Sequence, residues 1–147
     1  MKTLLVAHDF DEASERALDQ AISLARTLGA SVKVAHIYSV PMYAFPEGSA
    51  LIPSPEDAAR VGGDAQRHLD FVVQRHIDRG DGVTIEGILR SGTTADELCK
   101  LADEIGADMI VIGTHGRGII GRAVLGSVAQ QVVRMAKQPV LTVRVPG

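Results

Sequence analysis

The sequence contains very little of several residue types, and each scarcity excludes a class of protein. Cys99 is the single cysteine among 147 residues, so no disulfide can form within the chain. Aromatic residues make up 3% and tryptophan is absent, so a core must be built from valine, isoleucine, leucine and alanine. No apolar stretch approaches the roughly 20 residues that a membrane-spanning helix needs. Acidic residues also interrupt the opening apolar run too early for a signal peptide. We therefore expect a soluble, cytoplasmic chain with no membrane contact.

The charge is small overall but unevenly distributed. The net charge of -3 argues against general binding of nucleic acid. Residues 109–147 contain no Asp or Glu and carry five of the 15 basic residues, whereas the first 108 residues carry all 18 acidic ones. Positive charge near a glycine cluster suits a phosphate group. Taken alone, however, this charge favours an ordinary amphipathic helix whose basic residues face solvent.

The pattern of apolar residues predicts strands that alternate with helices. Short apolar runs predict five strands, at residues 2–7, 31–38, 83–89, 108–113 and 139–145. Helical periodicity predicts helices over residues 14–28, 56–79, 93–105 and 127–137. Residues 39–55 form a long connection without a clear period. Such alternation is typical of an α/β protein with a parallel sheet covered by helices on both faces, and we expect one domain, residues 1–147.

Ligands bind to such sheets beyond the carboxyl ends of the strands, where the strand order reverses. The turns after the first and fourth predicted strands, residues 7–10 and 113–127, are therefore the candidate positions. The second turn contains five glycines, which let backbone N–H groups approach an anion closely. Gly126 and Ser127 open a helix, whose N-terminus offers unpaired N–H groups to a phosphate. The alternative is a surface loop in which Ser127 caps the helix.

Known phosphate motifs fit this turn poorly. Residues 116–121 match G-x-G-x-x-G, but no acidic residue follows them to bind a ribose, and they follow the fourth strand instead of the first. A P-loop would need Lys and Ser or Thr where Arg122 and Ala123 stand. The surviving pattern is G-x2-G-x9-G-[ST], formed by Gly113, Gly116, Gly126 and Ser127.

With this pattern the chain resembles the universal stress protein family, and specifically its ATP-binding branch. The likeness runs over essentially the whole chain. It rests on four further segments of the sequence, 8–10 (H-D-F), 35–37 (A-H-I), 125–128 (L-G-S-V) and 139–143 (P-V-L-T-V). The fold expected from it is an open five-stranded parallel sheet, Rossmann-like and similar to the adenine-nucleotide alpha-hydrolases, with strand order 3-2-1-4-5.

The resemblance also implies a function and a set of site residues. It implies a regulatory, stress-response protein that binds ATP, with Mg2+ or Mn2+ bridging the phosphates. Asp9 would contact the adenosine, the backbone of Ile37 would read the adenine, and the glycine loop would hold ribose and phosphates. The full set of expected nucleotide-binding residues is Ala7, Asp9, Ile37, Gly113, His115, Gly116, Arg117, Gly126, Ser127 and Val128.

Several residues have a structural alternative. Asp9 could instead cap the helix that follows it, and Asp11, where Ser is common in the family, could either cap that helix or repel phosphates. His115 is better explained by packing than by catalysis. A metal site made of His8, His36 and His115 lacks a dense set of carboxylates. Cys99 lies on an apolar helical face, which predicts a buried hydrophobic role.

Three functions compete on the sequence. A nucleotide-binding regulatory module, with slow hydrolysis at most, agrees best with a loop that binds through its backbone. An ATP hydrolase or another ATP-using enzyme would need a base beside the phosphates, and after residue 108 His115 is the one candidate. An interaction protein without a nucleotide conflicts with the intact glycines. The apolar last strand, 139–145, predicts an unprotected sheet edge and, as in the family, a homodimer.

Overall fold

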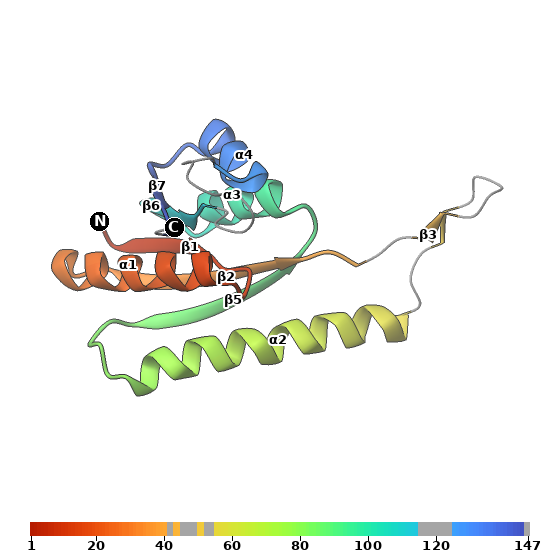
Figure 1. Ribbon diagram of the computed structural model, residues 1–147, viewed down its shortest axis with the longest axis horizontal. Helices are drawn as coiled ribbons and strands as arrows, with labels where there is room; N and C mark the ends of the chain where they lie inside the picture. Colours follow the sequence, from red (N-terminus) through yellow and green to blue (C-terminus); the bar gives the residue numbers. More distant parts are fainter. Residues whose placement is uncertain (41–42, 45–49, 52–54, 115–124, 146–147) are drawn as a thin grey trace.

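The structure is a computed structural model that describes residues 1–40, 43–44, 50–51, 55–114 and 125–145. Five strands form one parallel sheet, in the order β5-β2-β1-β6-β7 (Figure 1). Their bounds are Thr3–Ala7 for β1, Ser31–Tyr38 for β2, Ile85–Ser91 for β5, Met109–Gly113 for β6 and Val140–Val143 for β7. Counted along the chain, these are the five strands expected from the sequence, and the expected order 3-2-1-4-5 is confirmed.

Helices cover both faces of this sheet. Figure 1 shows α1 (Glu12–Leu28) and α2 (Pro55–Asp78) on one side, and α3 (Thr94–Glu104) and α4 (Ser127–Met135) on the other. The central strand β1 contributes side chains to the core layers on both faces of the sheet, because successive side chains of a strand point to opposite faces. Leu4 and Val6 are buried with α1 and α2, whereas Leu5 is buried with α3 and α4. The apolar runs of β1 and β6 are thus buried on both faces, whereas the edge strands β5 and β7 are mostly only partly buried.

The N-termini of α3 and α1 differ from the sequence-based predictions. The sequence offers Thr93 or Thr94 as the cap of α3, and Thr94 stands at a capping-box spacing from Glu97. In the structure α3 begins at Thr94 and its N-cap is Thr93, whose side chain makes no capping hydrogen bond. The capping-box prediction is therefore wrong. Helix α1 begins at Glu12, two residues earlier than its apolar stripe, because the Asp11 side chain accepts from the Ser14 N–H and caps it.

The long connection before α2 contains two elements that the sequence did not predict. Strand β3 (Tyr43–Ala44) pairs antiparallel with β4 (Ala50–Leu51). Strands of two residues are too short to show the alternation by which strands are recognised in a sequence.

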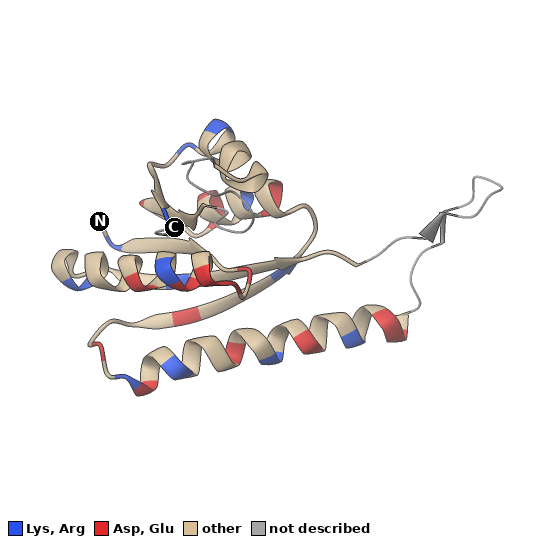
Figure 2. Ribbon diagram, in the orientation of Figure 1, with Lys and Arg blue, Asp and Glu red and all other residues tan. Residues whose placement is uncertain are grey.

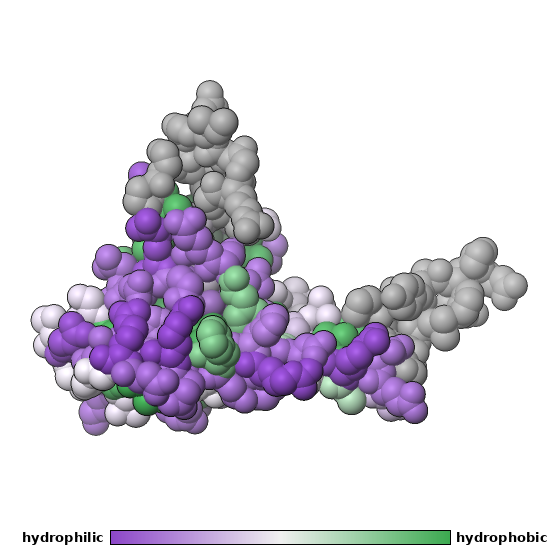
Figure 3. All heavy atoms as spheres, turned by 60° about the horizontal axis from the view of Figure 1, so that its bottom comes forward, coloured by the Kyte–Doolittle hydropathy of each residue, from purple (hydrophilic) through white to green (hydrophobic). Residues whose placement is uncertain are grey.

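The surface that carries α2 is mostly hydrophilic, with hydrophobic side chains in separate spots (Figure 3). Acidic and basic residues alternate along α2, whereas α4 has no acidic residue (Figure 2). Across the described residues, no helix combines the length and the hydropathy needed to cross a membrane.

Candidate functional site

A pocket lies beyond the carboxyl ends of the central strands, where the strand order reverses. It is bounded by the turn after β1, the ends of β2 and β6, and the first turns of α1, α3 and α4. Its lining residues are Ala7, His8, Asp9, Asp11, Ala13, Ser14, Ala35, Ile37, Thr94, Ile112, Gly113 and Val128. The two turns singled out in the sequence therefore flank one cavity, as expected for the switch point of a parallel sheet.

The structure brings half of the predicted site residues into the wall of this pocket. Ala7, Asp9, Ile37, Gly113 and Val128 all line it, although they come from four separate elements and the turn after β1. Gly126 and Ser127 lie directly before and at the start of α4, next to Val128. The remaining three predicted residues, His115, Gly116 and Arg117, fall outside the described residues.

Helix α4 begins beside the pocket with backbone N–H groups that have no acceptor within the helix. Its N-cap is Gly126, in an extended conformation with φ -62° and ψ 162°, and no side chain caps it. The first intrahelical bond runs from the Gln130 N–H to the Gly126 carbonyl, at 3.0 Å. The N–H groups of residues 127–129 therefore have no acceptor within the helix. Ser127 is the first helical residue, so its predicted alternative role as the N-cap is wrong.

Gly113 has a packing reason to be glycine. A Cβ atom built on this residue would lie 2.4 Å from the carbonyl oxygen of Ala13, in the first turn of α1. Contacts this short do not occur between non-bonded atoms, so a side chain at this position would push the end of β6 away from α1. This close approach of backbone to backbone requires glycine independently of any phosphate.

The turn after β1 is closed by side-chain hydrogen bonds. The Asp9 N–H donates to Ser14 Oγ at 2.9 Å, and the Phe10 N–H donates to His8 Nδ1 at 3.0 Å. The Ser14 N–H donates in turn to Asp11 Oδ1 at 2.9 Å. Since Asp11 is the cap of α1, the alternative role of Asp9 as that cap is wrong. Asp9 is exposed and lines the pocket.

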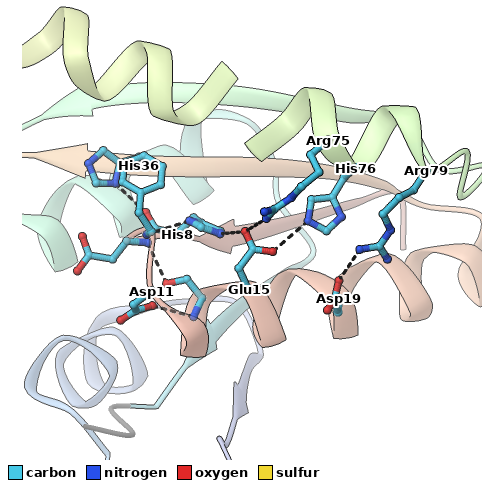
Figure 4. A network of polar contacts seen from close by, with 11 residues as sticks. His8, Asp11, Glu15, Asp19, His36, Arg75, His76 and Arg79 are labelled. Atoms are coloured by element: carbon cyan, nitrogen blue, oxygen red, sulfur yellow. Dashed lines mark hydrogen bonds and ion pairs between the residues drawn. The ribbon is translucent and has the colours of Figure 1, made fainter. Parts of the chain in front are cut away.

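A polar network that the sequence did not predict lies directly behind this turn (Figure 4). Glu15 of α1 occupies its centre and is about one-third exposed. His8 Nε2 lies 3.0 Å from Glu15 Oε1, and His76 Nε2 of α2 lies 3.2 Å from Glu15 Oε2. Arg75 forms an ion pair with the same carboxylate. Both histidine side chains are fully buried. The network links the wall of the pocket to α2.

Burial and partners shift the pKa values of this network in a consistent direction. Burial lowers the pKa of His8, and the nearby Glu15 carboxylate opposes that shift without cancelling it. Burial alone would raise the pKa of Glu15, but the hydrogen bonds from His76 and His8 and the charge of Arg75 outweigh it and hold that pKa below its usual value. A neutral His8 beside an ionised Glu15 is the state that these shifts favour at neutral pH.

The other residues singled out in the sequence have structural roles where the structure describes them. His36 Nδ1 donates to the His8 carbonyl at 2.7 Å, and the His36 ring packs against Phe10 with 4.2 Å between ring centroids. No group of three possible metal ligands occurs within the described part of the chain, while His115 lies outside it. Cys99 is partly buried against the core layer of α3 and α4, and burial raises its pKa.

Comparisons with known proteins agree with this arrangement. The sequence profile described as the universal stress protein family matches residues 1–144. A universal stress protein of Thermus aquaticus is 34% identical over 148 aligned residues, which cover 97% of this chain and 98% of that protein.

Two solved structures of universal stress proteins that resemble this chain contain bound nucleotides. The universal stress protein from Archaeoglobus fulgidus in complex with dAMP shares 28% identity at a TM-score of 0.66, with 97% of each chain covered. A universal stress protein in complex with cAMP shares 31% identity at a TM-score of 0.70, covering 97% of this chain and 96% of that one.

Proposed function

The chain belongs to the universal stress protein family, and from this premise we propose that it is a regulatory protein that binds an adenine nucleotide. The ligand we propose is ATP, with Mg2+ or Mn2+ bridging its phosphates. The observation that carries the proposal is the pocket at the switch point, which has at its wall the N-terminal turn of α4, whose first N–H groups have no acceptor within the helix. Binding would act through conformation or partners in a stress response.

The pocket supports a division of roles among the proposed site residues. The exposed Asp9 carboxylate is suited to accept hydrogen bonds from ribose hydroxyls. Ala7, Ile37 and Val128 supply apolar parts of the pocket wall, and the Ile37 backbone is the proposed reader of the base. Phosphates are proposed to bind at Gly126 and Ser127, together with the predicted residues 113 and 115–117.

Complexes of the relatives support the class of ligand. The ligands in those complexes are dAMP and cAMP, and both carry an adenine base on a phosphorylated pentose, which is 2′-deoxyribose in dAMP and ribose in cAMP. Our choice of a triphosphate rests on the resemblance of the pattern Gly113, Gly116, Gly126 and Ser127 to the ATP-binding branch of the family.

We propose slow hydrolysis at most. Fast hydrolysis needs a group that positions or deprotonates the attacking water. His8 is the histidine in the pocket lining, and both its ring nitrogens already have partners. The acidic residues of the lining, Asp9 and Asp11, belong to the turn after β1. This arrangement supports a binding module over an ATP-using enzyme.

Ser127→Asp tests the position of the phosphates. An acidic residue in the first turn of a helix favours the helix, so the protein should stay folded, but its charge would repel phosphates. We expect calorimetric titration with ATP and Mg2+ to show affinity at least about 10-fold weaker, as for the loss of about 1.4 kcal/mol. Adenosine, which has no phosphate, should bind as before.

Gln131→Asp, on an exposed position of the same helix one turn further along, is the matched control and should leave both affinities unchanged. Wild-type protein that binds neither ATP nor adenosine would contradict the proposed function. Equal loss of both ligands in Ser127→Asp would contradict the placement of the phosphates.

We further propose a homodimer through the outer edge of β7 and a cytoplasmic location. The edge position of β7 in the sheet supports the first, because an edge strand leaves a row of backbone groups unpaired within its own sheet. The single cysteine is consistent with the second.

A further inference from the structure

The turn that carries Asp9 depends on one ring nitrogen of the neighbouring histidine. The Phe10 N–H donates to His8 Nδ1, so this nitrogen acts as an acceptor and carries no proton. The proton of the neutral ring therefore lies on Nε2, which donates it to Glu15 Oε1. The two hydrogen bonds together assign a single tautomer to His8.

Phe10 needs this support because its backbone is strained. Its φ of +60° lies in the left-handed region, which residues with a side chain rarely occupy. The Phe10 ring is held between histidines, stacked against His36 at 4.2 Å and edge-on to His68 at 5.2 Å between centroids. The turn is thus a strained conformation that side chains hold in place.

We infer that His8 is a positioning residue for the nucleotide pocket, and that it holds the turn closed only while its ring is neutral. This inference rests on the proposed nucleotide binding. When Nδ1 takes a proton from solvent, it becomes a donor and faces the Phe10 N–H, which is also a donor. The hydrogen bond is lost, the strained turn is released, and Asp9 leaves its place at the pocket.

Charged groups on every neighbouring element act on this ring. Glu15 and Asp11 of the α1 end favour the protonated form, while His36 of β2 disfavours it. From α2, Arg75 and His76 act through their contacts with Glu15, and His68 lies against Phe10. The loss of hydration on burial is the largest of these effects on the pKa of His8 and lowers it from 6.5. Release of the turn is therefore expected on the acidic side of pH 6.5.

Two variants of His8 distinguish the roles of the hydrogen bonds made by its two ring nitrogens. In His8→Asn, the side-chain oxygen takes the place of Nδ1 and still accepts from Phe10, but cannot titrate. In His8→Gln, the side-chain amide nitrogen takes the place of Nε2 and still donates to Glu15, but the acceptor for Phe10 is gone. Each variant keeps one of the two hydrogen bonds and loses the other.

The experiment is a titration of wild type and both variants with ATP and Mg2+, and with adenosine, between pH 5.5 and 8. We expect wild-type affinity for both ligands to fall toward the acidic end of this range. His8→Asn should bind as wild type does at pH 8 and keep that affinity for adenosine at pH 5.5. His8→Gln should bind weakly at every pH. The phosphates of ATP also titrate, but they do so equally in the measurements of all three proteins. Differences between the proteins therefore do not come from the ATP phosphates.

A second measurement does not involve the ligand. The amide signal of Phe10 in NMR spectra should shift with pH in wild type and stay constant in His8→Asn over the same range. The inference is overturned if His8→Asn shows the wild-type pH dependence, or if His8→Gln binds adenosine as wild type does. If no form binds a nucleotide while the Phe10 signal still titrates with His8, the proposed function fails and the inferred role in binding fails with it, but the proton-dependent turn stands.

Discussion

The backbone of Gly113, at the end of β6, lies so close to Ala13 of α1 that a Cβ on residue 113 would approach the Ala13 carbonyl oxygen to 2.4 Å. The sequence pattern assigns Gly113 to a phosphate loop, and the structure adds a second demand on the same residue. Loss of nucleotide binding in a Gly113 variant would therefore reflect packing as well as any contact with a phosphate. Tests of the phosphate site are cleaner at Ser127 and Gly126.

Gly113→Ala is expected to destabilise the protein. The added methyl group meets main-chain atoms on a helix, which cannot move aside as a flexible side chain can, so the cost should reach about 3 kcal/mol, the upper end of the range for overpacking. Urea unfolding followed by circular dichroism measures it. Gly126→Ala is the control, because φ -62° and ψ 162° are open to alanine, and we expect it to lose about 1 kcal/mol. Equal stability of Gly113→Ala and wild type would contradict the close approach.

Glu15→Gln should destabilise the protein at neutral pH. The carboxylate accepts from His8 and His76 with its two oxygens, whereas an amide has one oxygen, so one buried histidine N–H would face another donor. A buried donor without an acceptor costs about 1–3 kcal/mol. Asp19→Asn, one turn further along α1, removes the exposed partner of Arg79 and should cost much less. Urea unfolding at pH 7 compares the two.

The difference between wild type and Glu15→Gln should depend on pH in a defined direction. The folded-state pKa of Glu15 lies below its ordinary value of 4.5, so the carboxylate stabilises the folded state fully above pH 4.5. This contribution is lost as the pH falls through the folded-state pKa, and the two proteins should converge there. A difference that stays constant down to pH 3 would show that the ionised carboxylate is not the stabilising group.

Substitutions at Asp11 separate its role as a cap from its charge. The Asp11 side chain accepts from the Ser14 N–H, so Asp11→Ala should lose about 1 kcal/mol of stability. Asp11→Asn keeps a capping oxygen and should stay within a few tenths of a kcal/mol of wild type. Thermal unfolding at pH 7 tells them apart. If Asp11→Asn loses as much as Asp11→Ala, the charge and not the cap supplies the stability.

The sequence was sufficient to predict the sheet because its signals are local. A run such as Met109–Gly113 is apolar at nearly every position, and the alternation with helices leaves few arrangements open. The pocket at the switch point follows from those elements, whereas the strand order was expected from the resemblance to the family. The hairpin between β2 and α2 was missed because its strands have two residues each, too few to show a period.

The predicted residues that line the pocket stand near strand ends or at the start of α4. His8 and Asp9 follow a buried strand directly, so their position was visible. The contact between Glu15 and His76 joins residues 61 positions apart on two different helices, and neither residue belongs to a motif. The requirement for glycine at position 113 likewise depends on how closely α1 packs against β6, and no local sequence pattern encodes that distance.

The outer edge of β7 can be blocked without damage to the core. Leu141 and Val143 pack against the core layer that contains α1, so a charge placed on either would disturb the fold itself. The Ile110 N–H donates to the Pro139 carbonyl and the Thr114 N–H to the Val143 carbonyl, which directs the backbone of alternate β7 residues toward β6. The Thr142 N–H lies between them and points away from the sheet.

Thr142→Pro removes this outward donor and should leave the pairing with β6 in place, because proline is tolerated on the open side of an edge strand. If a second copy pairs with this edge, sedimentation should show a dimer for wild type and mostly monomer for Thr142→Pro. Thr142→Ala keeps the N–H and should remain dimeric, which separates the backbone effect from the loss of the side chain. A Thr142→Pro protein that stays dimeric would exclude the β7 edge as the interface. A wild-type protein that is monomeric at all concentrations would exclude the dimer.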